Sequence, residues 1–143
     1  MSQNLTTVTA IYEAFGKGDI PTILAHMASD VQWESWADNY GQQAGVPWLQ
    51  ARQGQEGVLA FFQYLGSQMQ VTEFQVLSIM DGGQQIAVEF TIAANLPALG
   101  THFRDEEIHL WTFNSAGKVS RLRHYTDTAK HIAAAKTKLK DEG

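Results

Sequence analysis

The sequence predicts an α+β fold in which helices cover one face of a curved antiparallel sheet. In the N-terminal half, apolar residues recur every three or four positions, which is the spacing of helices with one buried face. In the C-terminal half, four strand-like segments are separated by turn sequences such as "DGGQ" and "SAGK". With 143 residues the chain can bury one core, so we expect a single domain over residues 1–143.

Two helices are predicted at the start of the chain. The first has its apolar stripe between Leu5 and Phe15 and is ended by the glycine-containing turn "GKGD". Asp19 is a suitable N-cap for the second, with Pro21 in the first turn, where a missing N–H costs nothing. We expect this second helix to end near Ser29.

A strand and a long loop are predicted before the third helix. "VQWESW" at residues 31–36 is the strand, and the residues from 37 to 57 are rich in Gly, Gln and Asn, which is typical of a loop. Helical spacing returns in residues 56–69.

The rest of the chain is predicted to form a four-stranded antiparallel meander and a closing helix over about Thr128 to Leu139. The four strands are residues 71–80, 85–96, 105–114 and 119–127. Apolar groups lie on both faces of these strands: Trp111 and Phe113 share one side, while Ile108 and Leu110 take the other. We therefore expect a homodimer in which the outer sheet face packs on a second copy.

The composition excludes several classes of protein. A net charge of -5 gives no broad attraction for nucleic acid, and the absence of cysteine excludes disulfides, a thiolate nucleophile and a Cys-ligated zinc site. No apolar run is long enough to cross a membrane and no leader pattern opens the chain. We expect a soluble, cytoplasmic protein with no membrane or nucleic-acid partner.

Three stretches carry a resemblance that spans nearly the whole chain. "IYEAFGKGDIPTILAHMASDVQW" resembles a family opening of aromatic helix, Gly-Asp turn, short helix and strand, and "PWLQARQGQEGVLAFFQYL" resembles the loop into helix three. "HLWTFNSAGKVSRLRHYTDT" is similar to the paired last strands. In this order the sequence resembles the superfamily of nuclear transport factor 2, the ketosteroid isomerases and the SnoaL-like polyketide cyclases. The resemblance implies a cone-shaped cavity between sheet and helices that takes small apolar molecules, and leaves the reaction open.

The resemblance and the residue types nominate two proton-transfer groups. His109 falls where the isomerases place the acid of their oxyanion hole, and histidine titrates nearest neutrality. Asp127 matches the closing aspartate of the cyclase relatives, where an apolar cavity would raise its pKa. The alternatives are a histidine that completes a polar patch, and an aspartate that caps the final helix.

Other side chains are expected to bind or shape the substrate. Arg123 and Tyr125 share a strand face with Asp127, and we expect this face to line the cavity and hold a carbonyl or anionic group. Arg123 has a structural alternative, which is to pair with Asp127 or Glu107. The aromatic candidates for the cavity are Trp33, Trp48, Trp111 and Tyr12.

Two residues differ from the isomerase pattern and argue against that activity. Ser35 stands where the isomerases carry their aspartate base, and Ile11 stands where they carry a tyrosine, so we do not expect steroid isomerase activity. No metal-ligand spacing and no phosphate-binding loop is present, so we expect neither metal nor cofactor. The predicted function is acid/base chemistry on a small hydrophobic carbonyl compound; the alternatives are a non-catalytic binding domain for an apolar metabolite and a dimeric interaction module.

Overall fold

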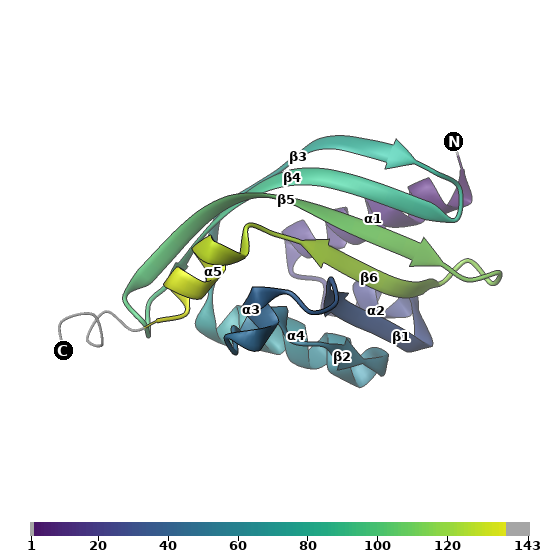
Figure 1. The fold of residues 1–143 in the computed structure, drawn as a ribbon. Coiled ribbons are helices and arrows are strands. Elements are labelled where there is room, and N and C mark those ends of the chain that lie inside the picture. Colours follow the sequence, from purple (N-terminus) through teal and green to yellow (C-terminus); the bar gives the residue numbers. More distant parts are fainter. Residues whose placement is uncertain (1, 137–143) are drawn as a thin grey trace.

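The computed structural model describes residues 2–136, in which a strongly curved sheet arches over helices (Figure 1). The described strands form one sheet in the order β2-β1-β6-β5-β4-β3. Their bounds are Met27–Ser35 (β1), Arg52–Gln53 (β2), Gln70–Asp81 (β3), Gln85–Leu96 (β4), Thr101–Phe113 (β5) and Val119–Tyr125 (β6). This mixed architecture confirms the predicted α+β class.

The predicted meander is present in β3, β4, β5 and β6, which pair antiparallel in sequence order. β1 joins it by pairing parallel to β6, and the two-residue β2 closes the edge antiparallel to β1. β1 begins at Met27, earlier than the predicted strand, because α2 is only one and a half turns long. Residues 37–57 also contain more regular structure than predicted, including two short helices.

The helices are α1 (Gln3–Lys17), α2 (Ile20–Ala25), α3 (Tyr40–Gln43), the 3-10 helix η1 (Pro47–Leu49), α4 (Gly54–Gln68) and α5 (Thr128–Ala134). α1 ends at Gly18, whose φ of 68° is the left-handed conformation that glycine adopts without strain. The Asp19 side chain accepts a hydrogen bond from the backbone N–H of Thr22 and caps α2, as predicted. The predicted end of the last helix, at Leu139, lies outside the described residues.

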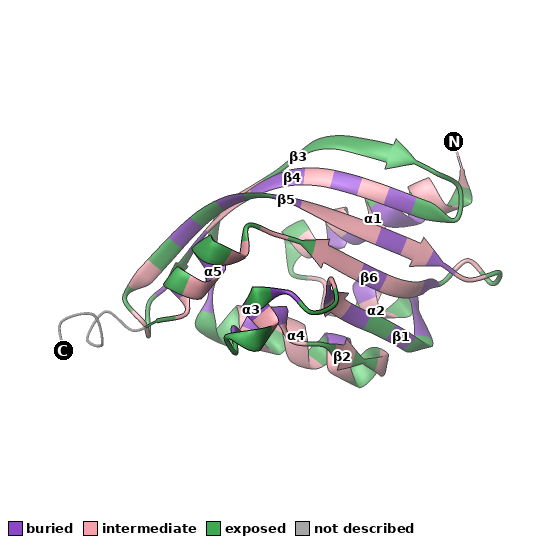
Figure 2. Cartoon of the chain, in the orientation of Figure 1, coloured by how far each residue is buried: buried purple, intermediate pink, exposed green. Residues whose placement is uncertain are grey.

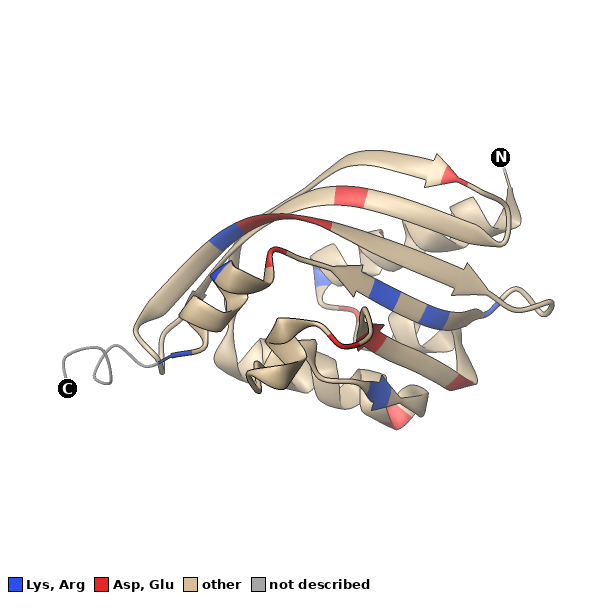
Figure 3. Ribbon diagram, in the orientation of Figure 1, with Lys and Arg blue, Asp and Glu red and all other residues tan. Residues whose placement is uncertain are grey.

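The core lies between the helices and the inner face of the sheet (Figure 2). Side chains alternate along β5, so that Phe103, Trp111 and Phe113 are buried while Ile108 and Leu110 turn to the outer face. β5 also carries the acidic run at residues 105–107 (Figure 3), of which positions 105 and 107 point inward. None of the helices in the described part of the chain is long and apolar enough to span a membrane.

Candidate active site

A cavity lies between the inner face of the sheet and helices α1 and α4, and its walls are rich in aromatic side chains. All four aromatic residues nominated from the sequence line it: Trp33, Trp48, Trp111 and Tyr12. His109 lines it as well, together with six polar residues that were not nominated: Glu34, Ser35, Gln50, Glu107, His124 and His131. The cavity is therefore an apolar space in which a few polar groups converge, as in many small-molecule sites.

The first polar group is a hydrogen-bonded chain that we name the tyrosine chain: Trp111, Tyr12 and His109. The indole N–H of Trp111 donates to the Tyr12 hydroxyl oxygen at 3.0 Å. The same hydroxyl lies 2.6 Å from Nδ1 of His109. An indole nitrogen can only donate, so the Tyr12 hydroxyl accepts from Trp111. Among the described residues only His109 lies where it can take the hydrogen of this hydroxyl, so we assign that hydrogen to the contact with His109 Nδ1. His109 Nδ1 is therefore an acceptor, and the hydrogen of the neutral ring lies on Nε2.

Burial makes this neutral form of His109 the stable one. Burial lowers the pKa of His109 well below its ordinary value, and the neighbouring His124 lowers it further, against a smaller opposing effect of Glu107. Burial also raises the pKa of the Tyr12 phenol, so that Tyr12 keeps its hydrogen and remains a donor. No described residue hydrogen-bonds Nε2 of His109. His109 therefore offers a neutral N–H group to whatever enters the cavity.

The second polar group, which we name the glutamate chain, links Trp48, His131, Glu107 and His124. The indole N–H of Trp48 donates to Nδ1 of His131 at 2.8 Å. Nε2 of His131 lies 2.7 Å from Oε2 of Glu107, and Nε2 of His124 lies 2.5 Å from Oε1 of the same carboxylate. Burial alone would raise the pKa of Glu107, but the two histidines outweigh it and hold the pKa well below its usual range.

Glu107 is therefore a buried carboxylate that accepts one N–H on each oxygen. Its two partners come from different elements, since His124 lies on β6 and His131 on α5. When His124 is neutral, its hydrogen lies on Nε2 toward Glu107 and its lone pair lies on Nδ1. No described residue hydrogen-bonds this Nδ1.

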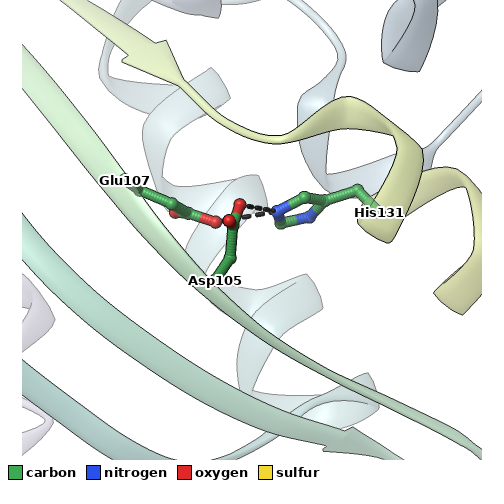
Figure 4. Close-up of side chains that lie close together, drawn as sticks. All are labelled: Asp105, Glu107 and His131. Atoms are coloured by element: carbon green, nitrogen blue, oxygen red, sulfur yellow. Dashed lines mark hydrogen bonds and ion pairs between the residues drawn. The ribbon is translucent and has the colours of Figure 1, made fainter.

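Asp105 joins the glutamate chain from the side, as Figure 4 shows. Its Oδ2 lies 3.0 Å from Nε2 of His131 and accepts the backbone N–H of Asp127 at 3.0 Å. Each of Asp105, Glu107 and His131 offers a donor atom within 4.8 Å of the others, which is close enough for a divalent metal ion.

The tautomer of His131 argues against a metal at this cluster. A metal would have to bind Nε2, and the ring would then carry its hydrogen on Nδ1. That nitrogen already faces the Trp48 N–H, so two donors would point at each other. The arrangement fits a shared hydrogen on Nε2 of His131 better than it fits a metal ion.

His109 and His124 are direct neighbours on the cavity side of the sheet. They are paired residues in the register of β5 and β6, and their ring centroids lie 4.7 Å apart. Ser35, at the position of the isomerase base, is the β1 partner of His124 and accepts a hydrogen bond from Asn39 at 3.1 Å. Both residues line the cavity, and neither Nε2 of His109 nor Nδ1 of His124 has a hydrogen-bond partner among the described residues.

The structure places three nominated residues outside the cavity lining. Arg123 forms an ion pair with Glu34 at 3.3 Å, and Tyr125, which is 39% exposed, stacks on Trp36. Asp127 is exposed and occupies the N-cap position of α5, although its side chain makes no capping hydrogen bond. The face of β6 that lines the cavity is the opposite one, with Leu122 and His124. This differs from our prediction, because strand alternation gives two faces and does not say which one turns inward.

Sequence reasoning missed the glutamate chain as a unit. Its members lie at positions 48, 107, 124 and 131 and meet only when η1, β5, β6 and α5 pack together. One signal was available: Leu122 is apolar and shares a face with His124, whereas Arg121 and Arg123 share the other.

The family model described as "SnoaL-like domain" matches residues 8–122. The chain belongs to the SnoaL-like family. This confirms the resemblance stated from the sequence, and the match runs from within α1 to Leu122 of β6, just before His124. No curated protein sequence is similar enough to this SnoaL-like chain to count as a relative.

Solved structures agree with the family. A nuclear transport factor 2-like protein from Burkholderia thailandensis is 20% identical with a TM-score of 0.80, covering 95% of this chain and 99% of that one. A second one, from Burkholderia pseudomallei, is 26% identical with a TM-score of 0.77, covering 94% and 98%. A protein from Xanthomonas campestris with a proposed polyketide cyclase activity is 21% identical with a TM-score of 0.68, covering 94% and 97%. These similarities place the SnoaL-like chain in the nuclear transport factor 2-like superfamily.

Proposed function

We propose that this SnoaL-like protein is an enzyme that moves a proton on a small hydrophobic carbonyl compound without a cofactor. The observation that carries the proposal is the pair of neighbouring histidines, His109 and His124, which offer the cavity one N–H donor and one lone pair. A ketone or related compound needs both at once, because its oxygen must be stabilised while a proton leaves the adjacent carbon.

In the first step, the carbonyl oxygen accepts a hydrogen bond from Nε2–H of His109. Nδ1 of His124 takes the proton from the α-carbon, and the electrons of that C–H bond form the C=C bond of an enolate. The negative charge moves to the oxygen, where the His109 N–H stabilises it. His124 becomes an imidazolium beside the Glu107 carboxylate, which stabilises the cation without taking its proton.

The second step decides the overall reaction. Return of the proton from His124 to another carbon gives isomerisation. Attack of the enolate carbon on a second carbonyl, whose oxygen takes the proton from His124, gives cyclisation. Departure of a β-hydroxyl group as water, with the proton from His124, gives dehydration. The proposed polyketide cyclase activity of the Xanthomonas campestris structure is consistent with the second of these. Asp127 and Arg123 have no part in this scheme, because neither lines the cavity.

The aromatic walls give the substrate preference. Trp33 packs edge-on against Trp111 with centroids 5.7 Å apart, and Trp48 stacks with Phe103 on the α5 side of the cavity. Such walls favour a flat or apolar molecule over a charged one. We expect Trp33, Trp48, Trp111 and Tyr12 to contact the substrate.

The first step can be tested without knowing the natural substrate. In D₂O, the protein should catalyse exchange of the α-protons of an aromatic ketone such as 2-tetralone, which is followed by loss of the proton NMR signal. His124→Gln should remove the exchange and His109→Gln should weaken it strongly, while the matched control His102→Gln, an exposed residue of β5, should leave it unchanged. Ketone binding seen by quenching of tryptophan fluorescence, with no exchange above the control rate, would instead support a non-catalytic binding domain.

We also propose that the protein forms a homodimer through the outer sheet face. Ile108 and Leu110 point to this face, and the side chains of Leu77 and Met80 on β3 are each 47% exposed in the single chain. Light scattering of the purified protein should give the mass of a dimer, and Leu110→Glu should give that of a monomer. A monomeric wild-type protein at micromolar concentration would contradict the dimer.

A further inference from the structure

We propose that Trp48 and His131 are positioning residues that set the polarity of His124, so that His124 presents a lone pair and not an N–H to the cavity. The catalytic consequence of this inference rests on the proposed function. The polarity itself rests on the geometry of the glutamate chain.

The glutamate chain starts at the Trp48 indole, which can donate a hydrogen bond but cannot accept one. The indole nitrogen of Trp48 has a hydrogen and no lone pair to offer, so its 2.8 Å contact with Nδ1 of His131 requires a lone pair on that nitrogen. His131 must then carry its hydrogen on Nε2. Trp48 is 5% exposed and His131 is 1% exposed, so water cannot readily replace either partner.

The hydrogen on Nε2 of His131 determines the state of Glu107. It points at Oε2 of Glu107 and Oδ2 of Asp105, so both oxygens act as acceptors and neither carboxyl group needs a hydrogen of its own. With Oε2 satisfied, Oε1 of Glu107 is left to accept from Nε2 of His124. The hydrogen of neutral His124 is thereby held on Nε2, and the lone pair on Nδ1 is left for the cavity.

Without the Trp48 N–H, the same residues have another arrangement. His131 could then take up a second hydrogen on Nδ1, or carry its hydrogen on Nδ1 alone while one hydrogen taken up from solvent lies on Glu107. If that hydrogen lies on Oε1, Glu107 donates it to Nε2 of His124, whose own hydrogen would be on Nδ1. His124 would then show the cavity a donor, as His109 does, and the proposed base would be lost.

The carboxylates around His131 favour a protonated ring, so the Trp48 N–H decides whether Nδ1 of His131 carries a hydrogen. The charged groups that face its ring are Asp105 and Glu107 of β5, with His124 of β6 beyond Glu107; its other ring neighbours, Trp48 and Phe103, are neutral. Burial lowers the pKa of His131, but hydrogen bonds to Asp105 and Glu107 outweigh it and raise the pKa to about 9. These carboxylates favour a cationic ring, whereas the Trp48 N–H at 2.8 Å fits only a ring with a free Nδ1. The geometry therefore corresponds to a neutral His131 held against the pull of the carboxylates.

Nitrogen NMR of the histidine rings tests this directly. In uniformly ¹⁵N-labelled wild-type protein at about pH 10, above the pKa of about 9 that the carboxylates give His131, His131 should carry a hydrogen on Nε2 only. In Trp48→Phe, His131 should acquire a hydrogen on Nδ1, and His124 should shift at least partly to its Nδ1–H form. The matched control is Trp33→Phe, which changes a cavity tryptophan that makes no hydrogen bond to a described residue and should leave both rings unchanged.

The wild-type spectrum alone can overturn the inference, even if Trp48→Phe fails to fold. Hydrogens on both nitrogens of His131 would mean that the Trp48 contact does not control the ring, and an unchanged His131 in Trp48→Phe would mean the same.

A second readout separates positioning from mere structural support. Trp48→Phe should reduce kcat for ketone exchange by tenfold or more while KM changes by less than threefold, and raising the pH should restore part of the rate by removing the extra hydrogen from His131. Equal loss at every pH would contradict the positioning role. Absence of exchange in the wild-type protein overturns the proposed function instead, and the ring spectra then decide the polarity on their own.

Discussion

The tyrosine chain and the glutamate chain begin in the same way and end in opposite ones. Each starts at the N–H of a buried tryptophan and ends at a histidine on the cavity wall. In the tyrosine chain each group donates a hydrogen bond to the next, from Trp111 to Tyr12 to His109. His109 therefore has an N–H left to donate into the cavity. In the glutamate chain the Glu107 carboxylate accepts hydrogen bonds from both His131 and His124, so the direction of donation reverses at Glu107. His124 therefore has a lone pair left for the cavity.

This difference teaches how a fold can give two identical side chains different chemical roles. His109 and His124 are cross-strand neighbours in the same cavity, yet the group behind each ring differs: a phenol stands behind one and a carboxylate behind the other. The phenol carries no negative charge to stabilise a protonated His109, whereas the carboxylate can stabilise a protonated His124. One ring is thus suited to donate a hydrogen bond and the other to accept a proton.

The largest expected effect comes from removing the end of the glutamate chain. His124→Gln should lower the rate of ketone α-proton exchange by about 10²- to 10⁴-fold, the usual contribution of a positioned acid or base. His109→Gln should cost less, because its amide can still donate a hydrogen bond to the carbonyl oxygen. An equal loss of exchange rate in His124→Gln and His109→Gln, measured by NMR, would contradict the different roles assigned to the two histidines.

Removing the negative charge of Glu107, which accepts from both histidines, should lower stability as well as activity. Glu107→Gln replaces a carboxylate by an amide with a single acceptor oxygen, so one of the two histidine N–H groups would face an NH₂ donor. We expect a loss of about 2–3 kcal/mol in the free energy of unfolding, measured with urea. Glu106→Gln, its exposed neighbour on β5, should change the free energy by less than about 0.5 kcal/mol.

Disrupting the tyrosine chain should lower the free energy of unfolding by a smaller amount. Tyr12→Phe removes one hydroxyl and leaves the Trp111 N–H and Nδ1 of His109 without their partner, at a cost of about 1–2 kcal/mol in the same urea experiment. The control Tyr40→Phe removes a hydroxyl from a residue that is 72% exposed and should be neutral. A Tyr12→Phe protein as stable as wild type would show that the chain does not hold His109.

The smallest expected effect is on pH dependence. The folded protein holds the pKa of His109 below its ordinary value of 6.5, so the unfolded chain takes up this proton first as the pH falls. His109 therefore makes stability decrease below about pH 6.5, with a slope of at most about 1.4 kcal/mol per pH unit for one proton. His109→Gln should flatten the curve in urea titrations between about pH 7.5 and 5. A curve of unchanged slope would mean that His109 is protonated as readily in the folded protein as in the unfolded chain.

The fold could be predicted from the sequence because its signals are local. Helical spacing from Leu5 to Phe15, the Asp19 cap and the four alternating segments each report on their own stretch of chain. The order of these elements then matched a known family. The short helices α3 and η1 were missed because tertiary packing, and not periodicity, holds such brief elements.

The candidate site could be predicted only in part. His109, Trp33, Trp48, Trp111 and Tyr12 were each nominated as a single residue, and all of them line the cavity. The glutamate chain was not found, because its hydrogen bonds join residues 48, 107, 124 and 131 through contacts that no spacing encodes. The inward face of β6 is set by pairing with β5, where Leu122 lies opposite Trp111, and the alternation of Arg121, Arg123 and Tyr125 alone could not reveal it.

The most direct test of the account is the position of the ring hydrogens on His109 and His124, read from long-range ¹H–¹⁵N correlations at about pH 8, where unperturbed histidines are neutral. The account predicts that each ring carries its hydrogen on Nε2 alone, which gives the cavity the N–H of His109 and the lone pair of His124. A hydrogen on Nδ1 of His124 would make both rings donors and contradict the proposed acid/base pair.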